Sequence, residues 1–210
     1  MKYTYILWDF NGTILDDVQT GIDCVNTLLK RRGLAEIPDK DYYRSVFGFP
    51  VIDYYRRLGF DFAKEDYHDI AVEWVELYNQ KSKSAPVNPG IKEMLELFRL
   101  SGTKQYILSA TELCMLKAQV EQLGIGMYFD GIFGLDNIHA GSKTSLAEIW
   151  ASRVEPGRTL LVGDTVHDYE CALKTGADCV LYSGGHMKRA ALEKCGCGVI
   201  DDIRLLSEYI

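Results

Sequence analysis

This sequence has no excess of basic residues and no long apolar run, and each absence excludes a class of function. Its 210 residues include 23 Lys and Arg against 30 Asp and Glu, which gives a formal net charge of -7. A protein that binds nucleic acid along its phosphates needs a basic surface, so no nucleic-acid partner is expected. No apolar run approaches the roughly 20 residues of a membrane-spanning helix, and the start of the chain has no secretion-signal pattern. We therefore expect a cytoplasmic protein with no membrane partner.

Paired cysteines are missing as well. The six cysteines include no CxxC pair, and the lone Cys195-Gly-Cys197 has no partner pair at the spacing of a zinc site. Reduced thiols without a catalytic role are the simplest interpretation. Internal repeats and low-complexity tracts are also absent. What remains is an ordinary globular composition, 47% hydrophobic and 25% charged, in a chain long enough for one large core and a second small domain.

The stretch around which the chain is organised is YTYILWDFNGT, residues 3–13. Its apolar run from Tyr5 to Trp8 is typical of a short strand buried in a sheet. The run stops at Asp9, and Asn11-Gly12 then tolerates the positive φ angles of a tight turn. A carboxylate at the carboxyl end of a buried strand, followed by exposed backbone N–H groups, is where open α/β sheets bind ligands.

A long helical block separates this strand from the next one. The spacing of apolar residues predicts a helix from residue 18 to Gly33 and further helices at 39–46, 51–58 and 65–78, with glycine and proline breaks between them. No strand pattern occurs in this block. We therefore predict a helical cap domain at residues 17–86, inserted into a core domain that residues 1–16 and 87–210 form.

Strand and helix patterns alternate in the rest of the chain. Strands are expected at residues 105–110, 131–134, 158–163, 179–182 and 198–200, with helices at 91–100, 112–123 and 145–153 and another ending at Gly176. Such alternation predicts a parallel sheet with helices on both faces. The expected fold class is therefore α/β, with a Rossmann-like core and an inserted helical cap.

Polar side chains follow these strands or lie on the loops between them, namely Asp9, Ser109, Lys143, Asp164 and Asp168. Separate carboxylates at one sheet edge repel each other unless a cation lies between them, and hard oxygen ligands suit Mg²⁺. A lysine and a hydroxyl beside that ion would neutralise and orient the oxygens of a phosphoryl group. A carboxylate next to the metal is left as the in-line nucleophile. Ser109 is equally suited to capping the following helix, and Lys143 to a solvated loop.

The order of these residues resembles that of the haloacid dehalogenase superfamily, and within it the phosphatases with an inserted helical cap. Asp9-Phe-Asn-Gly-Thr13 is similar to the first motif, Ser109 to the second, Lys143 in Gly-Ser-Lys to the third, and Gly163-Asp-Thr-Val-His-Asp168 to the acidic fourth. Arg44-xxx-Gly48-x-Pro50 and Pro89-Gly90 look like the phosphoglycolate phosphatase branch. The resemblance covers nearly the whole chain, and the four motifs occur in order at suitable spacing.

The resemblance implies Mg²⁺-dependent hydrolysis of the phosphate monoester of a small metabolite. Asp9 would be the nucleophile that becomes a transient aspartyl phosphate. The implied metal ligands are Asp9, the backbone carbonyl of Asn11 and Asp164, with Asp168 nearby or acting through water. Phosphate binding would fall to Ser109, Lys143 and the backbone N–H groups around Phe10, Gly12, Thr13 and Ala110.

The cap is expected to close over this site about hinges at residues 15–17 and 84–89. Arg44 would then be the cap's contact with the substrate, although a solvated helix charge is an equally good interpretation. The sequence leaves both a monomer and a dimer open.

One residue departs from the phosphatase pattern. Where these phosphatases carry a second aspartate two residues after the nucleophile, this chain has Asn11. In the family, that aspartate protonates the leaving oxygen and then activates the water that hydrolyses the aspartyl phosphate. An amide has no titrating proton and can do neither. Loss of such a group costs roughly 10²–10⁴-fold in rate.

Several interpretations of Asn11 stay open. The enzyme can favour phosphates with good leaving groups, or take its acid from the cap, from His167 or from His186. The chain can also be a slow or non-enzymatic relative that binds a phosphorylated ligand, and Asn11 can be a substitution introduced to trap a complex. Asn-Gly sequences deamidate in flexible peptides, which would place an aspartate there in part of a sample. A dehalogenase is disfavoured by Asp164 and Asp168, and a phosphosugar mutase needs the missing acid even more.

Overall fold

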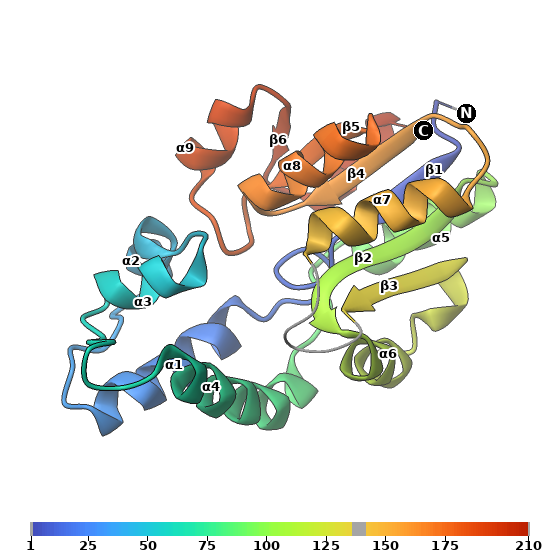
Figure 1. Ribbon diagram of the computed structural model, residues 1–210. Coiled ribbons are helices and arrows are strands. Elements are labelled where there is room, and N and C mark those ends of the chain that lie inside the picture. The colour runs from blue at the N-terminus through green and yellow to red at the C-terminus, as the bar shows by residue number, and fades with distance from the viewer. Residues whose placement is uncertain (1, 136–141, 210) are drawn as a thin grey trace.

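The sheet of this protein is parallel throughout. The computed structural model describes residues 2–135 and 142–209, so Met1, Gly141 and Ile210, which the predicted boundaries and the Gly-Ser-Lys motif include, lie outside the described residues. Within the described part, six strands form one sheet in the order β3-β2-β1-β4-β5-β6 (Figure 1). The strands are β1 (Tyr5–Trp8), β2 (Lys104–Glu112), β3 (Gly131–Leu135), β4 (Thr159–Gly163), β5 (Asp178–Tyr182) and β6 (Gly198–Ile200).

The central strand β1 pairs with β2 on one side and β4 on the other. The order of the strands along the chain therefore reverses at β1. In open α/β sheets, ligands bind beside such a reversal, at the carboxyl ends of the strands. The topology thus places the end of β1 where a site is expected.

Helices cover both faces of the sheet, which explains why β1 is apolar at every position. Ile6 and Trp8 pack in one buried cluster with residues of the helices on one face, and Tyr5 and Leu7 pack in another cluster on the opposite face. The first face is covered by α5 (Ile91–Leu100), α6 (Leu113–Gln122) and the 3₁₀ helix η4 (Ile203–Tyr209). The second is covered by α7 (Lys143–Arg153) and α8 (Val166–Thr175), as Figure 1 shows. The remaining short helices of this part are η2 (Gly126–Tyr128), α9 (Arg189–Leu192) and η3 (Glu193–Cys195).

The segment between β1 and α5 is helical, as the sequence predicts. It contains α1 (Val18–Arg31), α2 (Lys40–Val46), α3 (Val51–Arg57), α4 (Tyr67–Lys81) and η1 (Ser82–Ser84), and no strand occurs in residues 18–84, all of which the structure describes. This segment, called the cap from here on, has a buried hydrophobic cluster of its own that includes Leu28, Leu29 and Ile70. Figure 1 shows the cap beside the carboxyl ends of the strands. The predicted α/β fold with a helical insert is confirmed.

The chain leaves the sheet and returns to it along neighbouring paths. Leu15 forms an isolated antiparallel bridge with Val87, and the N–H of Asp16 donates to the carbonyl of Pro86 at 2.8 Å. Both connections between core and cap therefore run side by side. The division of the chain at residues 16/17 and 86/87 stays a prediction.

Two element boundaries differ from those predicted. The strand expected to end at Ala110 runs on to Glu112, with a register shift against β3 after Leu108. The helix expected from residue 145 begins at Lys143, because the side chain of Ser142 accepts a hydrogen bond from the N–H of Ser145 and caps the helix there. Lys143 therefore lies in the first turn of a helix and not in a loop. No helix within the described residues combines the length and apolar character needed to cross a bilayer.

Candidate active site

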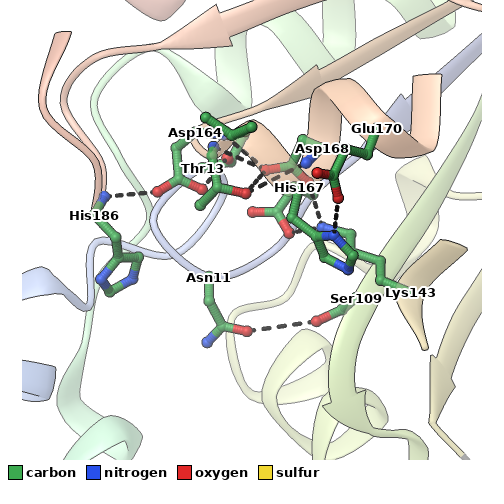
Figure 2. A network of polar contacts seen from close by, with 12 residues as sticks. Asn11, Thr13, Ser109, Lys143, Asp164, His167, Asp168, Glu170 and His186 are labelled. Atoms are coloured by element: carbon green, nitrogen blue, oxygen red, sulfur yellow. Dashed lines mark hydrogen bonds and ion pairs between the residues drawn. The ribbon is translucent and has the colours of Figure 1, made fainter. Parts of the chain in front are cut away.

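The carboxyl ends of three neighbouring strands bring the predicted polar side chains together. Asp9 follows β1, Asp164 follows β4, and Ser109 lies in β2. Because β1 lies between β2 and β4, these residues share one edge of the sheet. Lys143 and Asp168 reach the same region from the starts of α7 and α8, as Figure 2 shows. All five side chains are buried.

Lys143 joins two of the carboxylates. Its Nζ donates hydrogen bonds to Oδ1 of Asp9 and to Oδ1 of Asp168, the latter at 2.5 Å. The other oxygen of Asp168 accepts a hydrogen bond from the N–H of Thr165 at 2.9 Å, in the capping box that starts α8. Helix starts therefore fix both Lys143 and Asp168. This arrangement holds an ammonium group against Asp9.

Burial and charge act on these carboxylates in opposite directions. Burial raises the pKa of Asp9 well above its usual range, and the positive charge of Lys143 compensates only part of that effect. Burial also raises the pKa of Asp164 to about 6. Burial would raise the pKa of Asp168 too, but the charge and hydrogen bond of Lys143 outweigh it and lower that pKa. A cation bound beside Asp9 and Asp164 would supply the compensation that they lack.

The donor set fits a hard metal ion. Asp9, Asp164 and Asp168 can each offer one carboxylate oxygen such that the three oxygens lie within 4.8 Å of one another. Oδ2 of Asp9 is buried and has no hydrogen-bond partner among the described residues, which is costly for a carboxylate oxygen unless a ligand satisfies it. Carboxylates at such spacing suit Mg²⁺ and similar oxygen-seeking cations. The cluster can therefore hold a metal ion.

Two glycines allow the backbone to approach Asp164 closely. A Cβ atom at Gly12 or at Gly185 would collide with the Asp164 carboxylate, and Gly12 also has a φ of 80°, which other residues rarely adopt. Oδ2 of Asp164 accepts a hydrogen bond from the N–H of His186 at 2.6 Å, and Oδ1 accepts one from the hydroxyl of Thr13 at 3.3 Å. Both oxygens are thus positioned by their surroundings.

The side chain of Asn11 is held at both ends. Its Nδ2 donates to Oδ2 of Asp17 at 2.9 Å and to the hydroxyl of Tyr78 at 2.7 Å. Its Oδ1 accepts hydrogen bonds from the hydroxyl of Thr111 at 2.7 Å and from that of Ser109 at 3.4 Å, the second of which is drawn in Figure 2. The amide therefore fits this position as a donor and an acceptor at once, a combination that an ionised carboxylate does not offer.

Asp17, which is buried, and His186, which is partly buried, form an ion pair beside Asn11. Oδ1 of Asp17 lies 3.2 Å from Nε2 of His186 and also accepts a hydrogen bond from the N–H of Gly12 at 2.8 Å. Burial would lower the pKa of His186, but the charge of Asp17 outweighs it and raises that pKa to about 9. Burial acts to raise the pKa of Asp17, yet the charge of His186 and the hydrogen bonds to the carboxylate lower it. Both partners are therefore charged at neutral pH.

Sequence reasoning missed Asp17 as a member of the site. It stands at the N-cap position of α1, where an aspartate ordinarily accepts hydrogen bonds from the helix backbone, yet its side chain makes no such bond. Its partners Tyr78 and His186 lie 61 and 169 residues away in the chain. No local pattern indicates such contacts. The only available signal was an acidic residue shortly after the motif.

The cap cavity, as we call it, opens between this sheet edge and the cap. It has a volume of about 480 Å³, and its core side includes Asp9, Asn11, Ser109, Ala110, Lys143 and Asp164. His167 also lines it, and Nδ1 of that residue lies 2.8 Å from a carboxylate oxygen of the exposed Glu170. The candidate nucleophile Asp9 is therefore accessible from the cap cavity.

Other predicted phosphate-binding residues do not line the cap cavity within the described part of the chain. Phe10 is buried in the core, and the hydroxyl of Thr13 is bonded to Asp164. The N–H of Gly12 donates to the carbonyl of Leu15 and to Asp17. In this arrangement Gly12 has no free donor for a phosphate oxygen, and the phosphate-binding role of these three residues stays a prediction.

Arg44 contacts the core. Its Nε donates to the carbonyl of Gly185 at 2.8 Å, and its Nη2 donates at 2.5 Å to the carbonyl of Gly184, both in the loop between β5 and α9. It is not among the residues that line the cap cavity as the structure describes it. Arg44 thus connects cap and core, and its contact with a substrate stays a prediction.

Known proteins are similar to this chain in sequence. The model of the haloacid dehalogenase-like hydrolase family matches residues 6–182. The phosphoglycolate phosphatase of Pseudomonas fluorescens strain Pf0-1 is 26% identical over 96% of this chain and 77% of its own length. The phosphoglycolate phosphatase of Aquifex aeolicus is 25% identical over 87% of this chain and 86% of its own length.

The fold recurs in a solved structure, the haloacid dehalogenase-like family protein SP0104 from Streptococcus pneumoniae. Its TM-score is 0.82 at 22% identity, and the match covers 100% of this chain and 99% of that one. At this identity the likeness shows the fold alone. The family match spans β1 to β5 and so includes every residue of the four motifs that the sequence resemblance rests on. This chain therefore belongs to the haloacid dehalogenase-like hydrolase family.

Proposed function

We propose that this protein is a Mg²⁺-dependent hydrolase of small phosphate monoesters that works through an aspartyl phosphate on Asp9, with its acid/base step weakened by Asn11. One observation carries the proposal. Asp9 is buried at the cap cavity with one oxygen on Lys143 and the other unpartnered beside two further carboxylates. A nucleophile needs a free oxygen, and a metal needs the carboxylates, and this arrangement offers both.

The first step is attack of an Asp9 oxygen on phosphorus. The bond between phosphorus and the leaving oxygen breaks, and that oxygen departs with the electron pair. Lys143 neutralises charge on Asp9 and on the phosphate, and Ser109 orients a phosphate oxygen. Bound Mg²⁺, held by Asp9, Asp164 and the carbonyl of Asn11 with Asp168 close by, would offset the negative charge of the carboxylates and the phosphate.

The second step is hydrolysis of the aspartyl phosphate by water. A base must take a proton from that water, and the amide of Asn11 has no basic site for it. We therefore expect the second step to be slow, whatever the substrate. The names of the relatives favour a small phosphorylated metabolite as the substrate class.

The test is phosphate release from acetyl phosphate and from 4-nitrophenyl phosphate, in Mg²⁺ and in excess chelator. We expect release with Mg²⁺ only, and the acid-quenched protein should carry one phosphoryl group. Asp9→Asn should release no phosphate and carry no phosphoryl group, because its amide is not a nucleophile. Mg²⁺-independent release, or equal labelling of Asp9→Asn, would contradict the proposal.

A protein that binds a phosphorylated ligand without turnover is the second candidate, and Asn11 is the observation that favours it. Four hydrogen bonds hold its amide in place. An amide has no titrating proton, so Asn11 cannot act as the acid. This candidate predicts Mg²⁺-dependent binding of inorganic phosphate by calorimetry together with no phosphoryl group on Asp9. Labelling of Asp9 distinguishes the two functions.

A further inference from the structure

The cap side of the cap cavity is built from aromatic rings. Seven of them line it, namely Tyr43, Phe47, Phe49, Tyr54, Tyr55, Trp74 and Tyr78. They pack on one another, with Trp74 stacked on Tyr78 at 4.7 Å between ring centres and Phe47 edge-on to Tyr54 at 5.3 Å. Such a wall is fixed before a ligand enters, and it offers large apolar faces at small entropic cost.

The polar ends of two of these tyrosines are already in use. The hydroxyl of Tyr43 lies 2.8 Å from Nδ1 of His186, and the hydroxyl of Tyr78 donates to Asp17 at 2.5 Å. These side chains therefore present rings to a ligand rather than free hydroxyl groups. The remaining polar groups on the cap side include Asn79 and Tyr54, whose buried hydroxyl has no hydrogen-bond partner among the described residues, so this side of the cap cavity is mainly apolar.

No unpaired cation lines the cap cavity within the described residues. Its basic side chains are Lys143, which is bonded to Asp9 and Asp168, and the two histidines. His186 is paired with Asp17, and His167 with Glu170. No arginine lines it in that part of the chain. A second negative charge on the substrate would therefore be buried without a partner, which disfavours a charged leaving group.

We propose that the leaving group of the substrate is an uncharged aromatic alcohol, an inference that rests on the proposed function. The phosphate lies at the sheet edge near Asp9, and the ring lies against the aromatic wall, with Trp74 as the contact on α4. The reaction is hydrolysis of an aryl phosphate to a phenol and inorganic phosphate. The aryl oxygen leaves with the electron pair of the broken bond and takes its proton from water, so the first step needs no acid at Asn11.

The test compares substrates of matched leaving ability. Phenyl phosphate and 3-carboxyphenyl phosphate release phenols of similar acidity, so a difference in KM reports on the cap cavity and not on bond breaking. We expect the carboxylated compound to show a KM higher by about tenfold or more. Acetyl phosphate, which has no ring, tests the phosphate site alone.

Variants of Trp74 locate the ring. Trp74→Leu and Trp74→Ala should raise the KM for phenyl phosphate by about tenfold relative to the KM for acetyl phosphate. Tyr42→Ala removes a cap ring that is 43% exposed and does not line the cap cavity, and it should change neither. Circular dichroism of each variant shows that the cap still folds.

The outcomes separate this inference from the proposed function. If neither acetyl phosphate nor phenyl phosphate is hydrolysed with Mg²⁺, the proposed function fails, and this inference with it. If acetyl phosphate is hydrolysed while both aryl phosphates have equal KM values, or while folded Trp74→Leu keeps the wild-type KM for phenyl phosphate, only the aromatic leaving group is overturned.

Discussion

The amide nitrogen of Asn11 lies 2.7 Å from the hydroxyl of Tyr78, so the residue that departs from the phosphatase motif is also a direct link between core and cap. Asn11 follows the end of β1, and Tyr78 lies in the last turn of α4. The same amide donates to Oδ2 of Asp17, and Oδ1 of Asp17 pairs with His186. A change at Asn11 therefore acts on chemistry and on cap closure together.

Asn11→Asp is expected to restore the missing acid. The new carboxyl group would lie next to Asp17, whose Oδ2 is 2.9 Å from the present amide nitrogen. Neighbouring carboxylates raise the pKa of one of the pair, which favours a protonated acid at this position. Because the second step is slow in the unaltered protein, we expect aryl phosphates to give a burst of product followed by slow turnover. In Asn11→Asp the burst should disappear, and turnover of alkyl phosphates should rise by about 10²-fold.

Rapid-mixing kinetics measure both effects, and Asn11→Asp combined with Asp9→Asn serves as the inactive control. The contrary result would be steady, rapid turnover of alkyl phosphates by the unaltered protein, with its mass confirming an intact Asn11. In that case another residue supplies the proton, and His167 and the cap are the first places to search.

Asp164→Ala is expected to weaken Mg²⁺ binding by about tenfold or more, because it removes both charge and a ligand from the carboxylate cluster. Titration calorimetry measures the affinity, and the rise in melting temperature with added Mg²⁺ provides a second readout. Asp202→Ala removes an exposed carboxylate outside the cluster and should leave both unchanged. Wild-type Mg²⁺ affinity in Asp164→Ala would rule out the predicted metal site.

Breaking the pair between Asp17 and His186 is expected to destabilise the protein. Asp17 is buried and the side chain of His186 is only 12% exposed, so Asp17→Asn leaves the histidine without its counter-charge, at a cost of about 3 kcal/mol or more in the free energy of unfolding. His186→Gln should cost a similar amount. The double variant should cost clearly less than the two single losses added together, because no lone buried charge remains. Urea denaturation measures all three, and simple additivity would show that the two side chains act independently.

Arg44→Ala is expected to loosen the cap. The side chain donates to two carbonyls of the loop after β5, so its removal takes hydrogen bonds from the closed arrangement. Amide hydrogen exchange should become faster in the predicted hinges at residues 15–17 and 84–89, and KM should rise several-fold for accepted substrates. Arg57→Ala is the matched control, because Arg57 donates to the carbonyl of Val46 within the cap. An unchanged KM for every substrate would rule out a contact between Arg44 and the substrate. Unchanged hydrogen exchange in the hinges would rule out a role for Arg44 in holding the cap on the core.

The sequence by itself determined the order of the elements and the residues of the sheet edge. The apolar run of β1 indicates a strand that is buried on both faces, and the alternation of strand and helix patterns indicates a parallel sheet. Asp9, Ser109 and Asp164 could be placed together because the carboxyl ends of neighbouring parallel strands share one edge. Strands, helices and the residues at strand ends follow from the spacing of apolar and polar residues over short stretches, and this spacing is visible in the sequence.

Only the tertiary structure decided what each polar group contacts. Lys143 bonds to Asp9 across 134 residues, and Asp17 meets His186 across 169. These contacts depend on how the cap packs on the core and on where a helix starts. Neither property leaves a periodic signal in the sequence. The aromatic wall of the cap cavity has the same origin, since its rings come from α2, α3 and α4 and from the segment between α2 and α3. Helical spacing predicts that such residues are buried, but only packing decides which of them face a ligand.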